Sequence, residues 1–239
     1  MAADPLIRVS GLRKTFGNHR VLDGLDVDVH EGEALAVLGA NGSGKTTLLK
    51  ILATLVRPTR GTARVAGHDC AKEAESVRRY VGLVAHGSYV YEDLTALENL
   101  TFWTTLAGRR ASAASLAGAL ASVELERFAD ERVRTFSAGM KRRLSLARFV
   151  LVQPRVLLLD EPFAGLDQRA KKWLEEHLAA FKAAGGALVM TTHSFGRELA
   201  VADRIAILAG GVVALDTPRG ALSPDEINRL YTLHVEDAP

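Results

Sequence analysis

The sequence has a single cysteine and no long apolar run. Cys70 is its only thiol, which excludes an intrachain disulfide and favours a reducing compartment. The longest apolar stretch, residues 205–215, is shorter than a transmembrane helix and contains Gly210 and Gly211. Residues 1–14 lack the apolar segment of a signal peptide, so we expect none. Together these absences predict a cytoplasmic chain.

The chain also lacks an excess of charge of either sign. Its 239 residues contain 30 Lys and Arg against 28 Asp and Glu, a formal net charge of +2. This balance gives no support to a nucleic-acid-binding surface or an acidic tail, and we expect no nucleic-acid partner. One basic stretch, KRRLSLAR at residues 141–148, is interpreted as a solvated helix face.

Short apolar runs alternate with helix-like segments, and the length fits one large α/β domain. Helical spacing occurs at residues 45–56, before Pro58, and at residues 168–186, where Gly185 and Gly186 end the segment. This alternation predicts an α/β fold with a mainly parallel sheet. Runs with strand character occupy residues 6–17, 19–30, 33–39, 61–69, 155–162, 187–194 and 204–216.

The pattern changes between about residues 88 and 148, where strand signals are rare. Segments such as ALENLTFWTTLAG and SAASLAGALASVELERF have helical apolar spacing. We therefore expect a helical subdomain at 88–148, inserted into a single domain of residues 1–239. The rest comprises a core with an N-terminal antiparallel β subdomain (1–87 and 149–220) and a C-terminal tail (221–239).

The strongest motif is GANGSGKTT, which fits the phosphate-binding pattern G-x-x-x-x-G-K-[ST]. Glycines let such a loop wrap a phosphate without Cβ clashes, and backbone N–H groups at the following helix face the anion. Lys45 would reach the β- and γ-phosphates, and the Thr46 hydroxyl would ligate Mg²⁺. A strand-like run precedes the motif and a helix follows, which favours a P-loop NTPase core over a chance match. The expected nucleotide-binding residues are Gly39, Ala40, Asn41, Gly42, Ser43, Gly44, Lys45, Thr46 and Thr47.

A second motif, VLLLDE, carries Asp160 and Glu161 to the end of an apolar strand. Ligands of open α/β sheets bind at the carboxyl ends of the strands. Asp160 is therefore a candidate for holding Mg²⁺, directly or through a water, and Glu161 for polarising a water that attacks the γ-phosphate. The alternative is an acidic pair that ends a strand by chance.

A third segment, FSAGM at residues 136–140, opens a helix. Ser137 is a candidate N-cap, and small residues leave backbone N–H groups open to an anion. From these residues alone, a capped helix start is the favoured interpretation.

The order of the motifs GANGSGKTT, FSAGMKRRLSLAR, VLLLDEP, GLD and TTHS resembles the ATP-binding subunits of ABC transporters, over about residues 6–218. The resemblance implies ATP and Mg²⁺ as cofactors, and ATP hydrolysis coupled to transport. It implies two partners: an integral membrane permease, which would hold the chain on the inner face of the cell membrane, and a second ATPase subunit, identical or different. ATP binding would close the dimer and hydrolysis would open it.

The resemblance also assigns roles outside the phosphate loop. Phe16 would stack on adenine, with burial in the core as the alternative. Asp167 in GLD would bridge the two subunits, and His193 in TTHS would contact the γ-phosphate and act with Glu161 in catalysis. The family signature, usually LSGGQ, would contact the ATP of the opposite subunit. It corresponds here to Phe136, Ser137, Ala138, Gly139 and Met140, and differs from LSGGQ at Phe136, Ala138 and Met140.

His86 falls where most members of that family have a glutamine that lends an oxygen to Mg²⁺. Because Mg²⁺ prefers oxygen ligands, we expect His86 to hydrogen-bond a metal-bound water or the γ-phosphate instead, with some pH dependence. The alternative is a bystander histidine. Residues 87–93 are the expected docking segment for the permease.

Within the family, VAHGSYVYEDLTALENLTF, DEPF and GGALVMTTH resemble the ATPase of the haem exporter of cytochrome c maturation; Phe163 is the last residue of DEPF. A drug or lipid exporter is the alternative. A non-transport ATPase acting on ribosomes or DNA is less favoured, because the chain has one phosphate loop and no heptad run. A non-hydrolysing regulator is disfavoured because Lys45, Asp160, Glu161 and His193 are all present.

Overall fold

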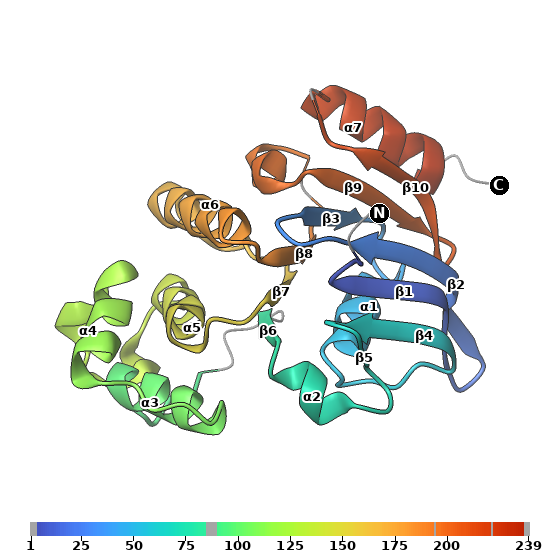
Figure 1. Ribbon diagram of the computed structural model, residues 1–239. Helices are drawn as coiled ribbons and strands as arrows, with labels where there is room; N and C mark the ends of the chain where they lie inside the picture. Colours follow the sequence, from blue (N-terminus) through green and yellow to red (C-terminus); the bar gives the residue numbers. More distant parts are fainter. Residues whose placement is uncertain (1–3, 85–89, 194, 221, 237–239) are drawn as a thin grey trace. The chain divides into compact units, whose positions relative to one another are not determined.

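The computed structural model describes residues 4–84, 90–193, 195–220 and 222–236. Its Cα positions group into two compact units. The first unit contains Met1–Leu83, Arg155–Pro162 and Glu175–Pro239, and the second contains Val84–Pro154 and Phe163–Leu174. In Figure 1 the strands of two sheets make up most of the first unit, and helices make up the second.

The first unit begins with an antiparallel sheet of strand order β2-β1-β4-β5. In β1, Ile7 and Val9 are buried in the alternation of a strand with one covered face, and a register shift between Val9 and Leu12 lets Leu12 be buried as well. Residues 61–69, predicted as one strand, lie in two, because Ala66 and Gly67 both have positive φ and form a two-residue hairpin turn. The four strands are β1 (Ile7–Phe16), β2 (His19–Val29), β4 (Arg60–Val65) and β5 (His68–Asp69).

The second sheet is mixed, with strand order β10-β9-β3-β8-β7-β6. Its strands are β3 (Ala34–Leu38), β6 (Val81–Val84), β7 (Val156–Asp160), β8 (Ala187–Thr191), β9 (Arg204–Ala209) and β10 (Val212–Pro218). Strands β7, β8, β3 and β9 are parallel, and every residue of β3, β7 and β8 is buried. The predicted α/β fold with a mainly parallel sheet and an N-terminal antiparallel sheet is confirmed.

One predicted strand of this sheet was wrong in its extent. Residues 204–216 form an antiparallel pair, β9 and β10, because Gly210 and Gly211 both adopt positive φ and reverse the chain.

Helix α1 (Lys45–Leu52) contacts β4 of one sheet and β7 and β8 of the other. Its apolar side chains are buried in the core that the two sheets share. The helix ends before residue 56, its predicted end, because Thr54 is left-handed, with φ of 62°. The N–H groups of Thr54 and Leu55 donate to Ile51 O and Lys50 O, which closes the last turn as a Schellman motif.

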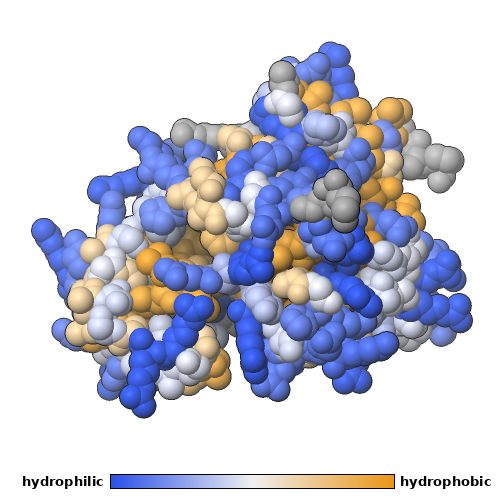
Figure 2. Space-filling view, in the orientation of Figure 1, coloured by the Kyte–Doolittle hydropathy of each residue, from blue (hydrophilic) through white to orange (hydrophobic). Residues whose placement is uncertain are grey.

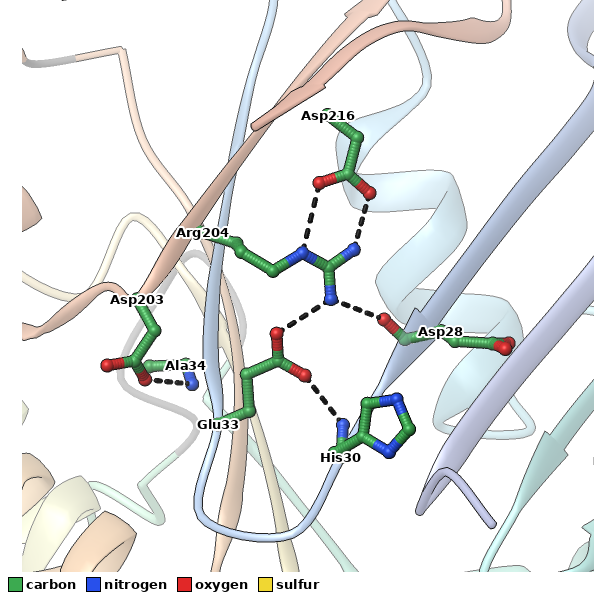
Figure 3. Close-up of polar contacts among 7 residues, drawn as sticks. All are labelled: Asp28, His30, Glu33, Ala34, Asp203, Arg204 and Asp216. Carbon is green, nitrogen blue, oxygen red and sulfur yellow. Dashed lines mark hydrogen bonds and ion pairs between the residues drawn. The ribbon is translucent and has the colours of Figure 1, made fainter. Parts of the chain in front are cut away.

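A charged cluster joins the two sheets of the first unit (Figure 3). Nε and Nη2 of Arg204 in β9 bind both carboxylate oxygens of Asp216 in β10, at 3.1 and 2.5 Å. Its Nη1 donates to Glu33 Oε1 at 2.7 Å and to the carbonyl of Asp28 in β2 at 3.0 Å. The hydrogen bonds that Arg204 donates to Asp216, and to a lesser extent to Glu33, raise its pKa, against the effect of burial. The cluster thus fixes the turn before β3 against β2, β9 and β10.

The second unit is built from helices whose apolar faces meet in one cluster. Thr95 and Glu98 form a capping box at the start of α3, and Ser112 caps α4, so both helices begin where side chains satisfy their N–H groups. Leu100, Leu120 and Leu144 lie in the cluster. The elements are α3 (Ala96–Leu106), α4 (Ala113–Ser122), α5 (Ala138–Val152) and short 3₁₀ helices at Glu126–Phe128 and Val133–Thr135.

The second unit is larger than the expected subdomain of residues 88–148. Helix α5 continues to Val152, so the predicted end at residue 148 falls inside it. Helix α6 (Gln168–Ala183) begins in this unit, where Trp173 packs against the helical cluster, and ends in the first.

The predicted solvated face at residues 141–148 was wrong, because Arg142 and Arg148 are buried. The guanidinium carbon of Arg148 lies 4.6 Å from the ring centre of Trp103 and 4.7 Å from that of Phe149. Burial, together with the charge of Arg142, lowers the pKa of Arg148 to about 10. A guanidinium is weakly hydrated and stacks on aromatic rings, which makes this burial possible.

The C-terminal segment of the first unit forms helix α7 (Pro224–Tyr231) and a π-helical turn, Thr232–Glu236. A capping box of Ser223 and Glu226 starts α7, with Pro224 in its first turn and Ile227 buried. Two further short elements are α2 (Ala74–Arg78) and a 3₁₀ helix, Arg197–Val201.

Most of the face drawn in Figure 2 is hydrophilic, and apolar residues show in separate patches. Within the described ranges, no helix combines the length and the apolar character needed to span a membrane.

Candidate functional site

The loop between β3 and α1 has the backbone that a phosphate cradle requires. Gly39 and Gly44 have φ of 156° and 107°. A Cβ on Gly39 would lie 2.5 Å from Leu208 O, and a Cβ on Gly44 would lie 2.6 Å from Leu22 Cδ2. Gly44 is also the N-cap of α1 and no side chain caps this helix, so its first N–H groups are left for an anion.

Two side chains of this loop complete the cradle. The Lys45 ammonium donates to Gly39 O at 2.7 Å and to Ala40 O at 3.0 Å, so it lies over the loop. Burial lowers the pKa of Lys45, while the charges of Glu161 and Asp160 oppose this shift. Ser43 Oγ is buried, with no hydrogen-bond partner in the part of the chain that the structure describes. An ammonium, an unpaired buried hydroxyl and open N–H groups are the donor set that fits phosphates.

Asp160, at the carboxyl end of β7, lies against this loop. The Thr46 hydroxyl is 3.0 Å from Asp160 Oδ2 and 3.3 Å from Oδ1. The hydroxyl of Thr191, the last residue of β8, donates to Asp160 Oδ1 at 2.6 Å. The structure thus brings together the two oxygen donors predicted for Mg²⁺, and this donor set suits a hard cation. Thr191 was not predicted, because nothing in the sequence places β8 beside β7.

Glu161 and His193 meet at the ends of the same two strands. Glu161 Oε2 lies 2.8 Å from His193 Nδ1, and the two side chains are 19% and 72% exposed. Glu161 has a left-handed backbone, with φ of 52°, and its N–H donates to both O and Oγ1 of Thr191 at 3.2 Å. Because β7 and β8 are parallel neighbours, with Asp160 opposite Thr191, the residues that follow them lie together.

Phe16 ends β1 and is 48% exposed, so the alternative of a core phenylalanine was wrong. The Lys14 ammonium lies 4.6 Å from the centre of its ring. An exposed aromatic face beside a cation is suited to stacking.

The signature-like segment lies in the second unit and starts α5. Ser137 is the N-cap, as predicted, and its Oγ accepts the N–H of Met140 at 3.2 Å. A Cβ on Gly139 would meet only Ser137 Oγ, at 3.9 Å, and Met140 packs against the helical cluster. Asp167 has a similar place before α6, where its Oδ1 accepts the N–H of Ala170 at 2.8 Å. These contacts show helix caps and leave the predicted dimer roles untested.

Residues 22–164 match the family described as ABC transporter. The chain belongs to this family. It is 37% identical over 237 residues to the daunorubicin/doxorubicin resistance ATP-binding protein DrrA of Streptomyces peucetius, covering 97% of this chain and 71% of that protein. The Nod factor export ATP-binding protein I of Burkholderia orbicola is 37% identical over 218 residues, covering 90% and 72%. A solved ATP binding subunit of an ABC transporter has a TM-score of 0.84 at 30% identity, covering 96% of this chain and 94% of that chain.

Membership of the ABC family confirms the predicted ATP-binding subunit and the predicted ATPase. The haem exporter expectation finds no support, because these relatives are named for drug resistance and Nod factor export. They favour the alternative, a drug or lipid exporter. Phe163, the last residue of the DEPF segment that suggested a haem exporter, is buried, so packing accounts for its presence. His86, in the first of the quoted segments, lies outside the described residues, as do residues 87–89 of the expected docking segment.

Proposed function

We propose that the chain hydrolyses ATP as one of two ATPase subunits that close on two ATP molecules and drive a separate membrane permease of an export system. The observation that carries this proposal is the meeting of two pairs, Thr46 with Asp160 and Glu161 with His193, beside the phosphate loop. On this proposal the chain binds the inner face of the membrane through the permease. Relatives named for drug resistance and Nod factor export support the direction of transport.

Bound ATP and Mg²⁺ would supply the γ-phosphoryl group and the charge that makes it reactive. Lys45 and the N–H groups of the loop hold the phosphates, and Thr46 and Asp160 hold Mg²⁺. Glu161 accepts a proton from the attacking water, and His193 keeps the Glu161 carboxylate and the water in place. Phe16 stacks on the adenine, and Thr47 and the remaining loop residues shape the cradle.

The second subunit would complete each site. The Ser137 hydroxyl accepts the Met140 N–H, which leaves its proton to donate to the γ-phosphate of the opposite subunit. Ala138 and Gly139 would offer their N–H groups to the same phosphate, since the N–H groups of a first helical turn face outward. Asp167 would bridge the subunits with the carboxylate oxygen that does not cap α6.

The catalytic assignment is tested with Glu161→Gln in the full chain. We expect ATP hydrolysis to fall by about 10²- to 10⁴-fold, the contribution of a general base, while ATP-bound dimers accumulate. Glu75→Gln, the same change at an exposed helical position, is the control and should hydrolyse ATP at the wild-type rate. Unchanged hydrolysis by Glu161→Gln, with no dimers on size-exclusion chromatography, would show that the assignment is wrong.

The transport role is tested by purifying the chain from its native membrane. We expect an integral membrane protein to co-purify in a fixed ratio. Recovery with ribosomes, and with no integral membrane protein, would contradict the proposal.

A further inference from the structure

The C-terminal helix α7 contacts the segment that carries His193. The rings of Phe195 and Tyr231 have centroids 5.0 Å apart, with their planes inclined by 57°. Phe195 follows His193 by two positions, and Tyr231 is the last residue of α7. Tilted aromatic pairs at this distance attract one another beyond the area they bury. Helix α7 therefore contacts the chain two positions beyond His193.

The segment around His193 needs such support. Thr192 before it and Leu199 after it are buried, but the His193 side chain projects with most of its surface exposed. Because the His193 side chain is 72% exposed, few neighbours restrict its rotamers, and its contact with Glu161 benefits from any further contact that holds the backbone. Packing of Phe195 limits where this backbone can lie.

Helix α7 is anchored well enough to provide this support. The Arg219 N–H donates to Asp203 O at 2.7 Å, which fixes the chain just before the helix. The capping box of Ser223 and Glu226 holds its first turn, and Ile227 is buried at its centre. Tyr231 is thus presented to Phe195 from a fixed element.

We infer that Tyr231 is a positioning residue for ATP hydrolysis, which acts through Phe195 to hold His193 against Glu161. The inference rests on the proposed catalytic role of His193. Without the ring contact, the His193 segment samples more conformations, and a smaller share of them place Nδ1 at 2.8 Å from the Glu161 carboxylate. Lys45 and the loop amides hold the nucleotide without this segment, so ATP binding is unchanged. Hydrolysis is thereby sensitive to anything that moves α7.

Tyr231→Ala in the full chain tests this inference by steady-state ATPase kinetics. We expect kcat to fall by about two- to tenfold, the range of an aromatic pair, with KM for ATP unchanged. Tyr231→Phe keeps the ring and should restore kcat. Asn228→Ala, at an exposed position of the same helix, is the matched control. Phe195→Ala removes the contact from its other side and should reproduce the loss, even if Tyr231→Ala disturbs folding of α7.

A second set in the His193→Ala background separates positioning from a general structural role. If Tyr231 acts through His193, Tyr231→Ala causes no further loss of kcat there; an equal further loss would overturn the inference. Wild-type kcat in both Tyr231→Ala and Phe195→Ala, with the kcat of His193→Ala lowered but measurable, would overturn this inference alone. Wild-type hydrolysis by His193→Ala would instead overturn the proposed role of His193, and this inference with it.

Discussion

Thr191→Val removes one hydroxyl from the centre of the site and leaves its shape almost unchanged. Thr191 is fully buried, and its hydroxyl donates to Asp160 Oδ1 at 2.6 Å. Asp160 keeps the Thr46 hydroxyl, and the Glu161 N–H keeps Thr191 O as an acceptor. The substitution therefore removes the short hydrogen bond to a buried carboxylate, together with the longer of the hydroxyl's two contacts, the one that accepts the Glu161 N–H at 3.2 Å.

A hydrogen bond to a charged group contributes about 1.5–3 kcal/mol to the free energy of unfolding, and both partners of this one are buried. We take about 2 kcal/mol, which lowers Tm by about 4–8 °C for a chain of this size. Mg²⁺ binding should also weaken, because Asp160 loses one of the contacts that orient its carboxylate. Partners of this kind alter metal affinity by about 10- to 100-fold, so the Mg²⁺ concentration for half-maximal hydrolysis should rise at least about tenfold.

The assay is ATPase activity titrated with Mg²⁺, beside a thermal melt of each variant. Thr191→Ser keeps the hydroxyl and should restore the Mg²⁺ dependence. Thr104→Val is the matched control: Thr104 is a buried threonine whose hydroxyl donates to the neutral carbonyl of Leu100 at 2.9 Å. It should lower Tm slightly and leave the Mg²⁺ dependence alone. A lower Tm for Thr191→Val with unchanged Mg²⁺ dependence would refute the orienting role of Thr191.

Two further predictions concern stability and reactivity. Arg204→Met leaves Glu33 and Asp216 without their shared cation, so urea denaturation should show a loss of about 2–4 kcal/mol, whereas Arg79→Met at an exposed pair should stay within about 0.5 kcal/mol. A loss as small as that of the control would contradict the cluster's role. Burial and the charge of Asp69 raise the pKa of Cys70 to about 12, so its thiol should react with a thiol reagent at pH 8 only once denaturant unfolds the chain. The thiol has a pKa of about 9 in the unfolded chain and about 12 in the folded chain. The stability that this difference contributes is complete below pH 9 and is lost as pH rises towards 12. Fast reaction of Cys70 in native buffer would contradict its burial.

Site features were predicted correctly from the sequence where all the residues that form them lie in one short segment. The phosphate loop is such a case, because its glycines and Lys45 act on a backbone only a few residues long. The Ser137 cap is another, since it bonds a residue three positions away. Asp160 and Glu161 were placed correctly at a strand end for the same reason.

Features that depend on which strands and helices become neighbours could not be predicted from the sequence. Thr191 reaches Asp160 only because β8 pairs with β7, and the sequence does not state the strand order. Arg148 looked solvated because its burial depends on Trp103, which belongs to another helix. The prediction of one strand over residues 204–216 was wrong for a different reason. Gly210 and Gly211 are a turn signal in the sequence, but the apolar run around them was given more weight.

The left-handed backbone of Glu161 affects which substitutions this position favours. A residue with a Cβ in that conformation costs about 1 kcal/mol or more relative to glycine, and only glycine relieves it fully. The position is therefore one where selection for folding and selection for turnover oppose each other. On the proposed function, glycine at this position would stabilise the fold and leave the subunits able to close on ATP, but would remove the base that hydrolysis needs. On the proposed catalytic role, the carboxylate at this position is a case of stability given up for turnover.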